Sequence, residues 1–472
     1  MERIPAADAA FLYMEHPTVH MHVTGVLVLD PSTVPGGYSF ERFRAHVMSR
    51  LHRIPIFRKR MLPSPLGIDH PVWVDDPEFD LDRHLHRVDL GGKATSDDLA
   101  AWVGEYASTP LDRNYPLWDM TVLEGFADGS LASVSKVHHV AVDGVTGTDI
   151  MAQIVDLEAD VEDDPPPPYR AAALPNRLVL AGDAVVSRVR DPLRGVRAFG
   201  RSFNSVARVL REVVGGDEED RATMARPFEA PRTFFNRSLT PRRAVAFSTA
   251  PLADLKRAKS VFGATVNDVF LAACTQALRQ YLADHGEHLD RPLVVSVPVS
   301  VHGEAADDRA VNQVSNMFVR LPVHVDDPVE QLHTIKADTR DAKVVHGALG
   351  ADMIGDVTEV TPPAIFNMAS RMYSSAGLAD RLAPIHNLVI SNVPGPPFPL
   401  YVAGARIAAV YPFGPLIEGS ALNITVLSNM GNMDIGVIGC PDVSPGIDEL
   451  ADGIAAGIEV LRVAAEEEAS RP

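Results

Sequence analysis

The chain has 472 residues, of which 46% are hydrophobic, and 43 basic against 62 acidic side chains give a formal net charge of −19 at pH 7. This length predicts two or three domains of about 150 residues each. The negative charge disfavours nucleic acid as a partner, because phosphates are neutralised by basic surfaces. No segment approaches the ~18 uninterrupted apolar residues of a membrane span, and the acidic N-terminus does not resemble a signal peptide. We therefore expect a cytoplasmic protein.

The first part of the chain, residues 1–160, is predicted to form a mixed α/β domain. Its expected elements are strands at 23–29, 120–123 and 132–137 and a helix at 145–157. The acidic and proline-rich run that follows cannot continue a helix or a strand, since prolines fix φ and remove donors. Residues 161–240 are therefore expected to be a linker.

The last part, residues 241–472, shows a fresh α/β pattern and is predicted to be a second domain. Its expected elements are strands at 244–247, 293–298, 388–391 and 422–427 and helices at 265–281 and 447–464. The only two cysteines, Cys274 and Cys440, lie far apart in apolar segments, which favours reduced core thiols over a disulfide. A ligand pocket is expected in the cleft between the two domains.

Within the linker, arginines alternate with apolar residues in a pattern typical of a basic amphipathic helix. The arginines are Arg188, Arg190, Arg194, Arg197, Arg201, Arg208 and Arg211. Such a helix either packs on a domain surface or contacts a lipid surface. The sequence leaves both interpretations open.

The heptapeptide HHVAVDG at residues 138–144 follows an apolar alternation, which places two histidines where a strand ends and a helix begins. An imidazole titrates near neutral pH and suits general base catalysis. Adjacent side chains point in different directions, so a metal site with Asp143 as a third ligand is disfavoured. A turn capped by the two histidines is the structural alternative. No GxSxG elbow or neighbouring cysteine supports a covalent acyl-enzyme.

Three further motifs flank this histidine pair. In ATVNDVF, Thr265 and Asp268 have the spacing of a helix capping box, whereas the Asn267 amide lies in the first helical turn and could help hold an oxyanion. Upstream, PLDRNYPLWDM predicts a turn with a packed Trp118. Downstream, ISNVPGPPFPLY predicts a rigid loop, which either lines a site or crosses between domains.

The motifs PLDRNYPLW, HHVAVDG, VNDVFLA, PVSV, NQVS and SNVPGP, in this order, resemble the bacterial wax ester synthase/diacylglycerol acyltransferase family. The opening segment adds Asp8, Phe11 and Glu15 in a D..F...E pattern, so the resemblance spans nearly the whole chain. It departs from the family at His302, where arginine is usual, and at Val311, where glycine is usual.

The resemblance implies an α/β fold of two chloramphenicol acetyltransferase-like domains, with the active-site tunnel at their interface. It implies direct transfer of a long-chain acyl group from acyl-coenzyme A to diacylglycerol, with a fatty alcohol left open as a second acceptor. No permanently bound cofactor or metal is expected. Peripheral contact with the inner membrane or lipid droplets is also left open.

The resemblance also distinguishes His139, as the general base, from His138. Residues assigned to catalysis are His139, His138, Asp143 and Asn267. Residues assigned to substrate binding or to the tunnel wall are Gly144, Trp118, Ser300, Asn312, Gln313, Asn392, Pro394 and Gly395. Two rival hypotheses remain: an acyltransferase that takes its acyl group from a carrier protein, and a weakly catalytic lipid-droplet-binding protein.

Overall fold

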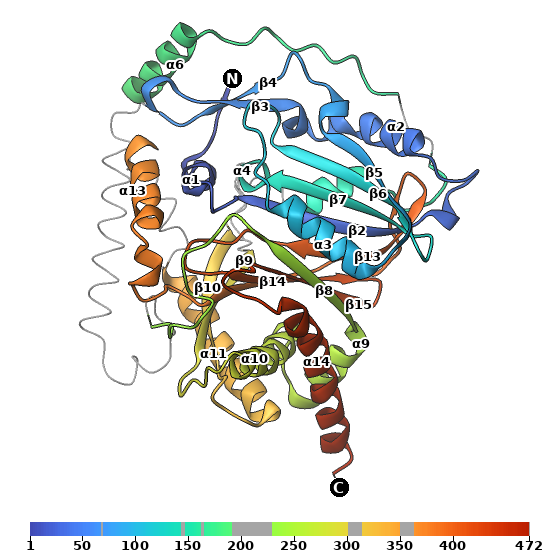
Figure 1. The fold of residues 1–472 in the computed structure, drawn as a ribbon, viewed down its shortest axis with the longest axis vertical. Coiled ribbons are helices and arrows are strands. Elements are labelled where there is room, and N and C mark those ends of the chain that lie inside the picture. Colours follow the sequence, from blue (N-terminus) through green and yellow to red (C-terminus); the bar gives the residue numbers. More distant parts are fainter. Residues whose placement is uncertain are drawn as a thin grey trace.

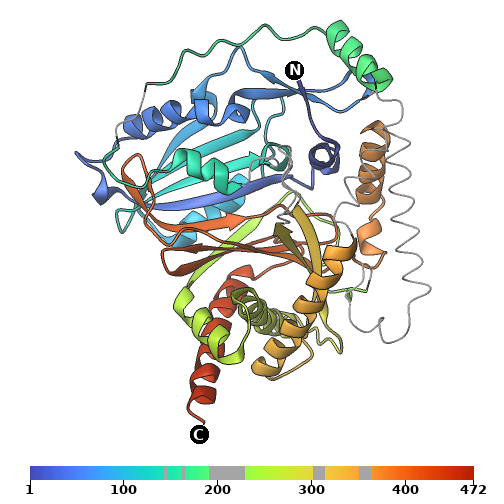
Figure 2. The same ribbon diagram turned by 180° about the vertical axis from the view of Figure 1, so that it is seen from behind.

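The computed structural model describes residues 1–67, 69–142, 147–161, 165–190, 229–300, 314–349 and 363–471. Two six-stranded mixed sheets lie one above the other, and helices cover the outer face of the lower sheet (Figure 1). Seen from behind, the two sheets again lie face to face (Figure 2). The predicted α/β fold class is confirmed.

The N-terminal sheet has the strand order β12-β13-β2-β7-β6-β5. Its strands are β2 (His22–Asp30), β5 (Leu85–Ala94), β6 (Trp118–Phe126), β7 (Leu131–His138), β12 (Tyr401–Val402) and β13 (Ala405–Phe413). A small sheet beside it contains β1 (Glu2–Arg3), β3 (Lys59–Leu62) and β4 (Val72–Asp75). The helices of this part are α1 (Ala6–Met14), α2 (Phe40–Arg50), α3 (Ser96–Ala107), α4 (His139–Val142) and α5 (Gly147–Ile154). The strands predicted here are confirmed, and α5 is shorter than the predicted helix.

The C-terminal sheet has the strand order β10-β9-β11-β14-β15-β8. Its strands are β8 (Ala244–Pro251), β9 (Leu293–Ser300), β10 (Val314–Leu321), β11 (Leu388–Val393), β14 (Leu422–Asn429) and β15 (Asn432–Gly439). Its helices are α9 (Leu252–Phe262), α10 (Val266–Asp284), α11 (Pro328–Leu349), α13 (Pro363–Ser375) and α14 (Ile447–Ala469). Every element predicted in this part is confirmed, and both cysteines are free and buried as predicted.

The proline-rich loop after β11 crosses from one sheet to the other. β11 belongs to the C-terminal sheet, whereas β12 and β13 pair within the N-terminal sheet, where β13 lies antiparallel to β2. The buried Asp434 of β15 helps to hold this crossing strand, because it accepts a hydrogen bond from the backbone N–H of Val410 at 2.8 Å. The C-terminal part of the chain thus completes the N-terminal sheet.

Residues 165–176 of the linker have neither helix nor strand and run along the outside of the N-terminal part to α6 (Arg177–Arg190) (Figure 1). The Tyr169 hydroxyl fastens it by donating to the carbonyls of Arg58 and Asp76, each at 3.0 Å. Most of the predicted basic helix, including Arg194, Arg197, Arg201, Arg208 and Arg211, lies outside the described residues, which break off between residues 190 and 229.

The helices of the described ranges differ from membrane-spanning helices in length or hydropathy. None of them alone is long and apolar enough to cross a membrane. α9 and α10, which are bent by 105° relative to each other, pass that criterion of length and composition only when taken together.

Candidate active site

The histidine pair lies where β7 ends and the chain turns into α4. The backbone N–H of His138 donates to the carbonyl of Leu117 at 2.9 Å, and that of His139 donates to the carbonyl of Met21 at 2.8 Å. Successive backbone groups are therefore held by different neighbouring segments. This arrangement fixes where both imidazoles leave the backbone.

The His138 imidazole is completely buried, and both of its nitrogens face a defined neighbour. Nδ1 accepts a hydrogen bond from the backbone N–H of Val140 at 3.1 Å, and Nε2 lies 3.4 Å from Oε2 of Glu15. An accepting Nδ1 leaves the proton of a neutral imidazole on Nε2, toward the carboxylate. His138 is therefore held by a hydrogen bond at Nδ1 and by an electrostatic contact with Glu15 at Nε2, which makes no hydrogen bond with a described residue.

Glu15, immediately after α1, is held in turn by Arg113. The Arg113 Nε donates to Glu15 Oε2 at 2.9 Å, its Nη2 donates to the same oxygen, and Nη2 also reaches the carbonyl of Leu12 at 2.9 Å. Burial alone would raise the pKa of Glu15, but His138 and Arg113 together lower it to about 2. The carboxylate is thus ionised at neutral pH and forms the centre of an Arg113–Glu15–His138 chain.

His139 has a different environment from His138. Its ring stacks on Phe11 of α1, with the centroids 4.0 Å apart and the planes 21° from parallel. Its Nδ1 is buried, with no hydrogen-bond partner among the described residues. Burial, and then the neighbouring His138, lower the pKa of His139 to about 4. The imidazole is therefore neutral at physiological pH and is able to accept a proton.

Asn267 and Asn392, which the sequence assigned to the site separately, lie together. The Asn392 Nδ2 donates to the Asn267 Oδ1 at 3.4 Å, which joins the start of α10 to the end of β11. Asp268 has the capping role expected for it: its carboxylate accepts from the backbone N–H of Thr265 at 2.8 Å, and its own N–H donates to the Thr265 hydroxyl at 3.1 Å. Because Thr265 and Asp268 cap the helix, the side-chain amide of Asn267 is not needed for capping.

Gly395 lies against the end of β14 in the crossing loop, whereas the preceding Pro394 is exposed. The backbone N–H of Gly395 donates to the Ser428 hydroxyl at 2.8 Å, and a Cβ at position 395 would come within 2.0 Å of the Ser428 carbonyl oxygen. Only glycine fits this close backbone approach.

We predict that Gly395→Ala is strongly destabilising, because backbone on both sides must move to accept the methyl group. Overpacking of this kind costs typically about 1–3 kcal/mol. The measurement is thermal unfolding followed by circular dichroism. Gly431→Ala is the control, because a Cβ there meets nothing within 4 Å, although the positive φ of 89° adds some strain. A smaller loss for Gly395→Ala than for Gly431→Ala contradicts the prediction.

The other residues assigned from the sequence are placed as follows. Trp118 is buried in the N-terminal core, where its Nε1 donates to the carbonyl of Phe57 at 2.8 Å and its ring stacks between Phe57 and His84. Ser300 is the last residue of β9, paired with Val314 of β10. Asp143, Gly144, Asn312 and Gln313 lie outside the described residues, as do His302 and Val311. Within the described ranges, no group of three or more His, Cys, Asp or Glu side chains is arranged to hold a metal ion.

Phe11, Glu15 and Arg113 were not among the site residues predicted from the sequence. The D..F...E pattern indicated that Phe11 and Glu15 lie on the same side of the chain, because residues three or four apart share one face of a helix. No sequence pattern indicated the role of Arg113, because its neighbour in the sequence is Asp112, whereas its carboxylate partner in the structure is Glu15. Asp112 instead accepts from the backbone N–H of Asn114 at 2.9 Å.

A cavity of about 670 Å³ lies between α1, the turn after β3, and α13. Its lining includes Tyr13, Met368, Met372 and Arg371. Tyr13 is two residues beyond Phe11, or about 200° further around α1. The cavity is thus on the side of α1 away from His139, and its wall is mainly apolar but includes the charged residues Asp69 and Arg371.

Comparison with known proteins gives a consistent result over the whole chain. Residues 4–270 match the family model described as the wax ester synthase/diacylglycerol acyltransferase catalytic domain, and residues 311–462 match its C-terminal domain. A candidate diacylglycerol O-acyltransferase of Mycobacterium tuberculosis is 38% identical over 462 residues, covering 98% of this chain and 90% of that protein. Another from the same organism is 33% identical over 475 residues, covering 100% and 99%.

Solved structures agree with the sequence comparison. The wax ester synthase/diacylglycerol acyltransferase from Marinobacter aquaeolei VT8 superposes with a TM-score of 0.68 at 25% identity, covering 99% of this chain and 100% of that one. The first condensation domain of the CDA synthetase gives a TM-score of 0.55 at 17% identity, covering 99% and 97%. The latter likeness concerns the fold alone.

Proposed function

Because the chain belongs to the wax ester synthase/diacylglycerol acyltransferase family and is an acyltransferase, we propose that it transfers a long-chain acyl group from acyl-coenzyme A to diacylglycerol, with His139 as the general base. The observation that supports this role best is the neutral, Phe11-stacked imidazole of His139 beside a clamped His138. A base must be unprotonated at working pH, and burial, which lowers the pKa of His139 to about 4, keeps its imidazole in that form.

The proposed reaction is a direct transfer. The His139 imidazole takes the hydroxyl proton as the acceptor oxygen attacks the thioester carbonyl, so that a C–O bond forms. When the tetrahedral intermediate collapses, the C–S bond breaks and the proton passes from the imidazolium to the departing coenzyme A thiolate. His138, Glu15 and Arg113 orient the motif, and no covalent enzyme intermediate is needed.

We propose Asn267 as a donor to the tetrahedral oxyanion, since its amide lies in the first turn of α10, where unpaired backbone N–H groups also favour negative charge. Asn267→Ala is expected to lower kcat about 10²-fold or more, as loss of one such donor does, with little change in KM. Steady-state kinetics on the purified variant test this. Thr265→Ala is the control because it removes the helix cap alone; an equal kcat for the two variants contradicts the oxyanion role.

The depressed pKa of His139 predicts an unusual pH dependence. Since the imidazole stays neutral down to about pH 4, kcat/KM should be level between about pH 5.5 and 8. An imidazole with its usual pKa would instead lose half of its base form near pH 6.5. The folded state also loses stability as pH falls from 6.5 toward 4, because the unfolded chain binds the proton first. The rate is therefore normalised to the folded fraction at each pH, and a half-maximal value near pH 6.5 contradicts the prediction.

The acceptor is proposed to be diacylglycerol, with fatty alcohols as a second class that the same base could deprotonate. The test is a panel of fatty alcohols, monoacylglycerols and diacylglycerols with one acyl-coenzyme A, scored by product analysis. An acyl-carrier protein as alternative donor is included, and preference for it over acyl-coenzyme A overturns the donor assignment.

We further propose that the enzyme is cytoplasmic and docks on a membrane or lipid-droplet surface. α6 turns Leu178, Val179, Val185 and Val186 to solvent, with Leu178 83% exposed, while Leu180 packs inward. Exposed apolar residues on one helix face are typical of interfacial binding. Co-sedimentation with phosphatidylcholine vesicles tests this: Leu178→Ser with Val185→Ser should weaken it, and an unchanged bound fraction contradicts the docking surface.

A further inference from the structure

The segment between α1 and β2, residues 15–21, touches both histidines and is here called the α1–β2 turn. At its start, Glu15 faces the imidazole of His138; at its end, the Met21 carbonyl accepts from the backbone N–H of His139. The backbone N–H of Met21 also approaches Glu15 Oε1 at 3.4 Å. The geometry of the histidine pair therefore depends on where this turn is held.

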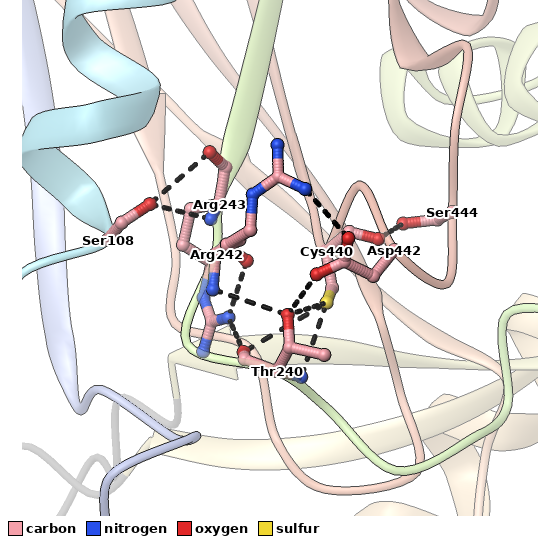
Figure 3. A network of polar contacts seen from close by, with 7 residues as sticks. All are labelled: Ser108, Thr240, Arg242, Arg243, Cys440, Asp442 and Ser444. Atoms are coloured by element: carbon pink, nitrogen blue, oxygen red, sulfur yellow. Dashed lines mark hydrogen bonds and ion pairs between the residues drawn. The ribbon is translucent and has the colours of Figure 1, made fainter.

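The middle of the turn is held by Arg243, which comes from the start of the C-terminal part of the chain. The Arg243 Nη2 donates to the Thr18 carbonyl at 2.8 Å, while Nη1 donates to the carbonyls of Thr240 at 2.6 Å and Arg242 at 2.8 Å. The backbone N–H of Arg243 donates to the hydroxyl of Ser108, just after α3, at 2.7 Å (Figure 3). Arg243 thus joins three segments that are distant in the sequence.

Arg243 is only 5% exposed, and the three acceptors of its guanidinium are backbone carbonyls rather than carboxylates. Burying a cation on such partners is costly unless its hydrogen bonds are well made. Burial lowers the pKa of Arg243 to about 10, so the side chain is still charged at neutral pH. A simple packing role would be served by an apolar side chain at lower cost.

A second contact reaches the same turn from the C-terminal part. His16 Nε2 lies 3.8 Å from Glu418 Oε2, and Glu418 Oε1 accepts from the backbone N–H of Leu239 at 3.1 Å. Leu239 is four residues from Arg243. His20 Nε2 also lies 3.2 Å from the carbonyl oxygen of Pro241, so the C-terminal part contacts the α1–β2 turn at His16, Thr18 and His20.

We infer that Arg243 is a positioning residue for acyl transfer, which acts through the α1–β2 turn to hold Glu15 against His138 and the motif backbone in place. This inference rests on the proposed role of the histidine pair. The contact of Arg243 with the α1–β2 turn thus has a function: it sets the geometry of the histidine pair.

Arg242 is a matched control, since it is adjacent in sequence and has the same side chain. Its Nη1 donates to Asp442 at 2.8 Å, its side chain is 65% exposed, and this ion pair stays within the C-terminal part (Figure 3). Replacement of the Arg242 side chain therefore removes one exposed ion pair, with Asp442, and leaves the contacts of the α1–β2 turn unchanged.

The experiment compares Arg243→Met, Arg243→Lys and Arg242→Met by release of coenzyme A thiol from acyl-coenzyme A and diacylglycerol. Misplacement of catalytic groups by about 1 Å can cost about 10²-fold, so Arg243→Met should lower kcat about 10- to 100-fold while KM changes less than about twofold. Arg243→Lys should recover most of this loss, and Arg242→Met should match the parent enzyme. Equal losses for Arg243→Met and Arg242→Met overturn the inference.

A double-mutant cycle with Glu15→Gln separates positioning from general destabilisation. If Arg243 acts through Glu15, then Arg243→Met should cost little more once Glu15 has been replaced, whereas additive losses overturn the inference. Should Arg243→Met not fold, the cycle is run with Arg243→Gln, which keeps a polar donor in the buried site but is shorter than the guanidinium, with the same criterion. If His139→Ala retains turnover, the proposed function fails; if it is inactive while the cycle is additive, only the present inference fails.

Discussion

Replacing His139 with alanine is expected to lower kcat about 10²- to 10⁴-fold, which is the usual contribution of a general base. The measurement is coenzyme A thiol release with a long-chain acyl-coenzyme A and diacylglycerol. The fold should be retained, because the buried Nδ1 of His139 has no partner among the described residues that would be left unpaired. Undiminished turnover contradicts the assignment of the base.

The neighbouring histidine supplies the control for this experiment. His138→Ala removes a partner of the Glu15 carboxylate and the acceptor of the Val140 N–H, so it is expected to lower the melting temperature as well as activity. Two variants at adjacent positions thus separate the chemical role from the structural one. If His138→Ala is as stable as His139→Ala, the orienting role of His138 is wrong.

Much of the fold follows from periodicity along the chain. The alternation in β7 and the apolar run of α10 predict a strand and a buried helix wherever they pack, and the structure has both. β13 shows why this has a limit: its sequence permits a strand, but nothing in it specifies pairing with β2, which lies hundreds of residues earlier. Sheet membership is decided by tertiary packing, which no local pattern carries.

The candidate site shows the same division. The HHVAVDG motif located the histidines at the end of a strand, and the capping-box spacing correctly assigned Asp268. The Arg113–Glu15–His138 chain was not predictable in this way. Glu15 and Arg113 alone are separated by 98 residues in the sequence, and they meet only after folding. A hydrogen bond between distant segments has no local sequence pattern. The four-residue spacing of Phe11 and Glu15 indicates only that the two side chains share one face of a helix, not which residues they contact.

The second large effect is expected at Glu15. Glu15→Gln keeps the shape of the side chain but removes the charge that faces His138 and Arg113, so kcat should fall about 10²-fold through misplacement of the histidine pair. The melting temperature should fall too, because the Arg113 guanidinium loses its carboxylate. Steady-state kinetics and thermal unfolding measure the two effects on the same preparation.

The pH dependence of stability distinguishes this ion-paired carboxylate from an ordinary surface acid. Because the pKa of Glu15 is lowered to about 2 in the folded state, its ionised form stabilises the protein above the usual value of 4.5, and this contribution is lost as pH falls toward 2. Glu15→Gln should therefore flatten the acid side of the stability profile, whereas Glu467→Gln, on the exposed end of α14, should leave it unchanged. Parallel profiles for Glu15→Gln and the parent enzyme would show that the carboxylate is not held as described.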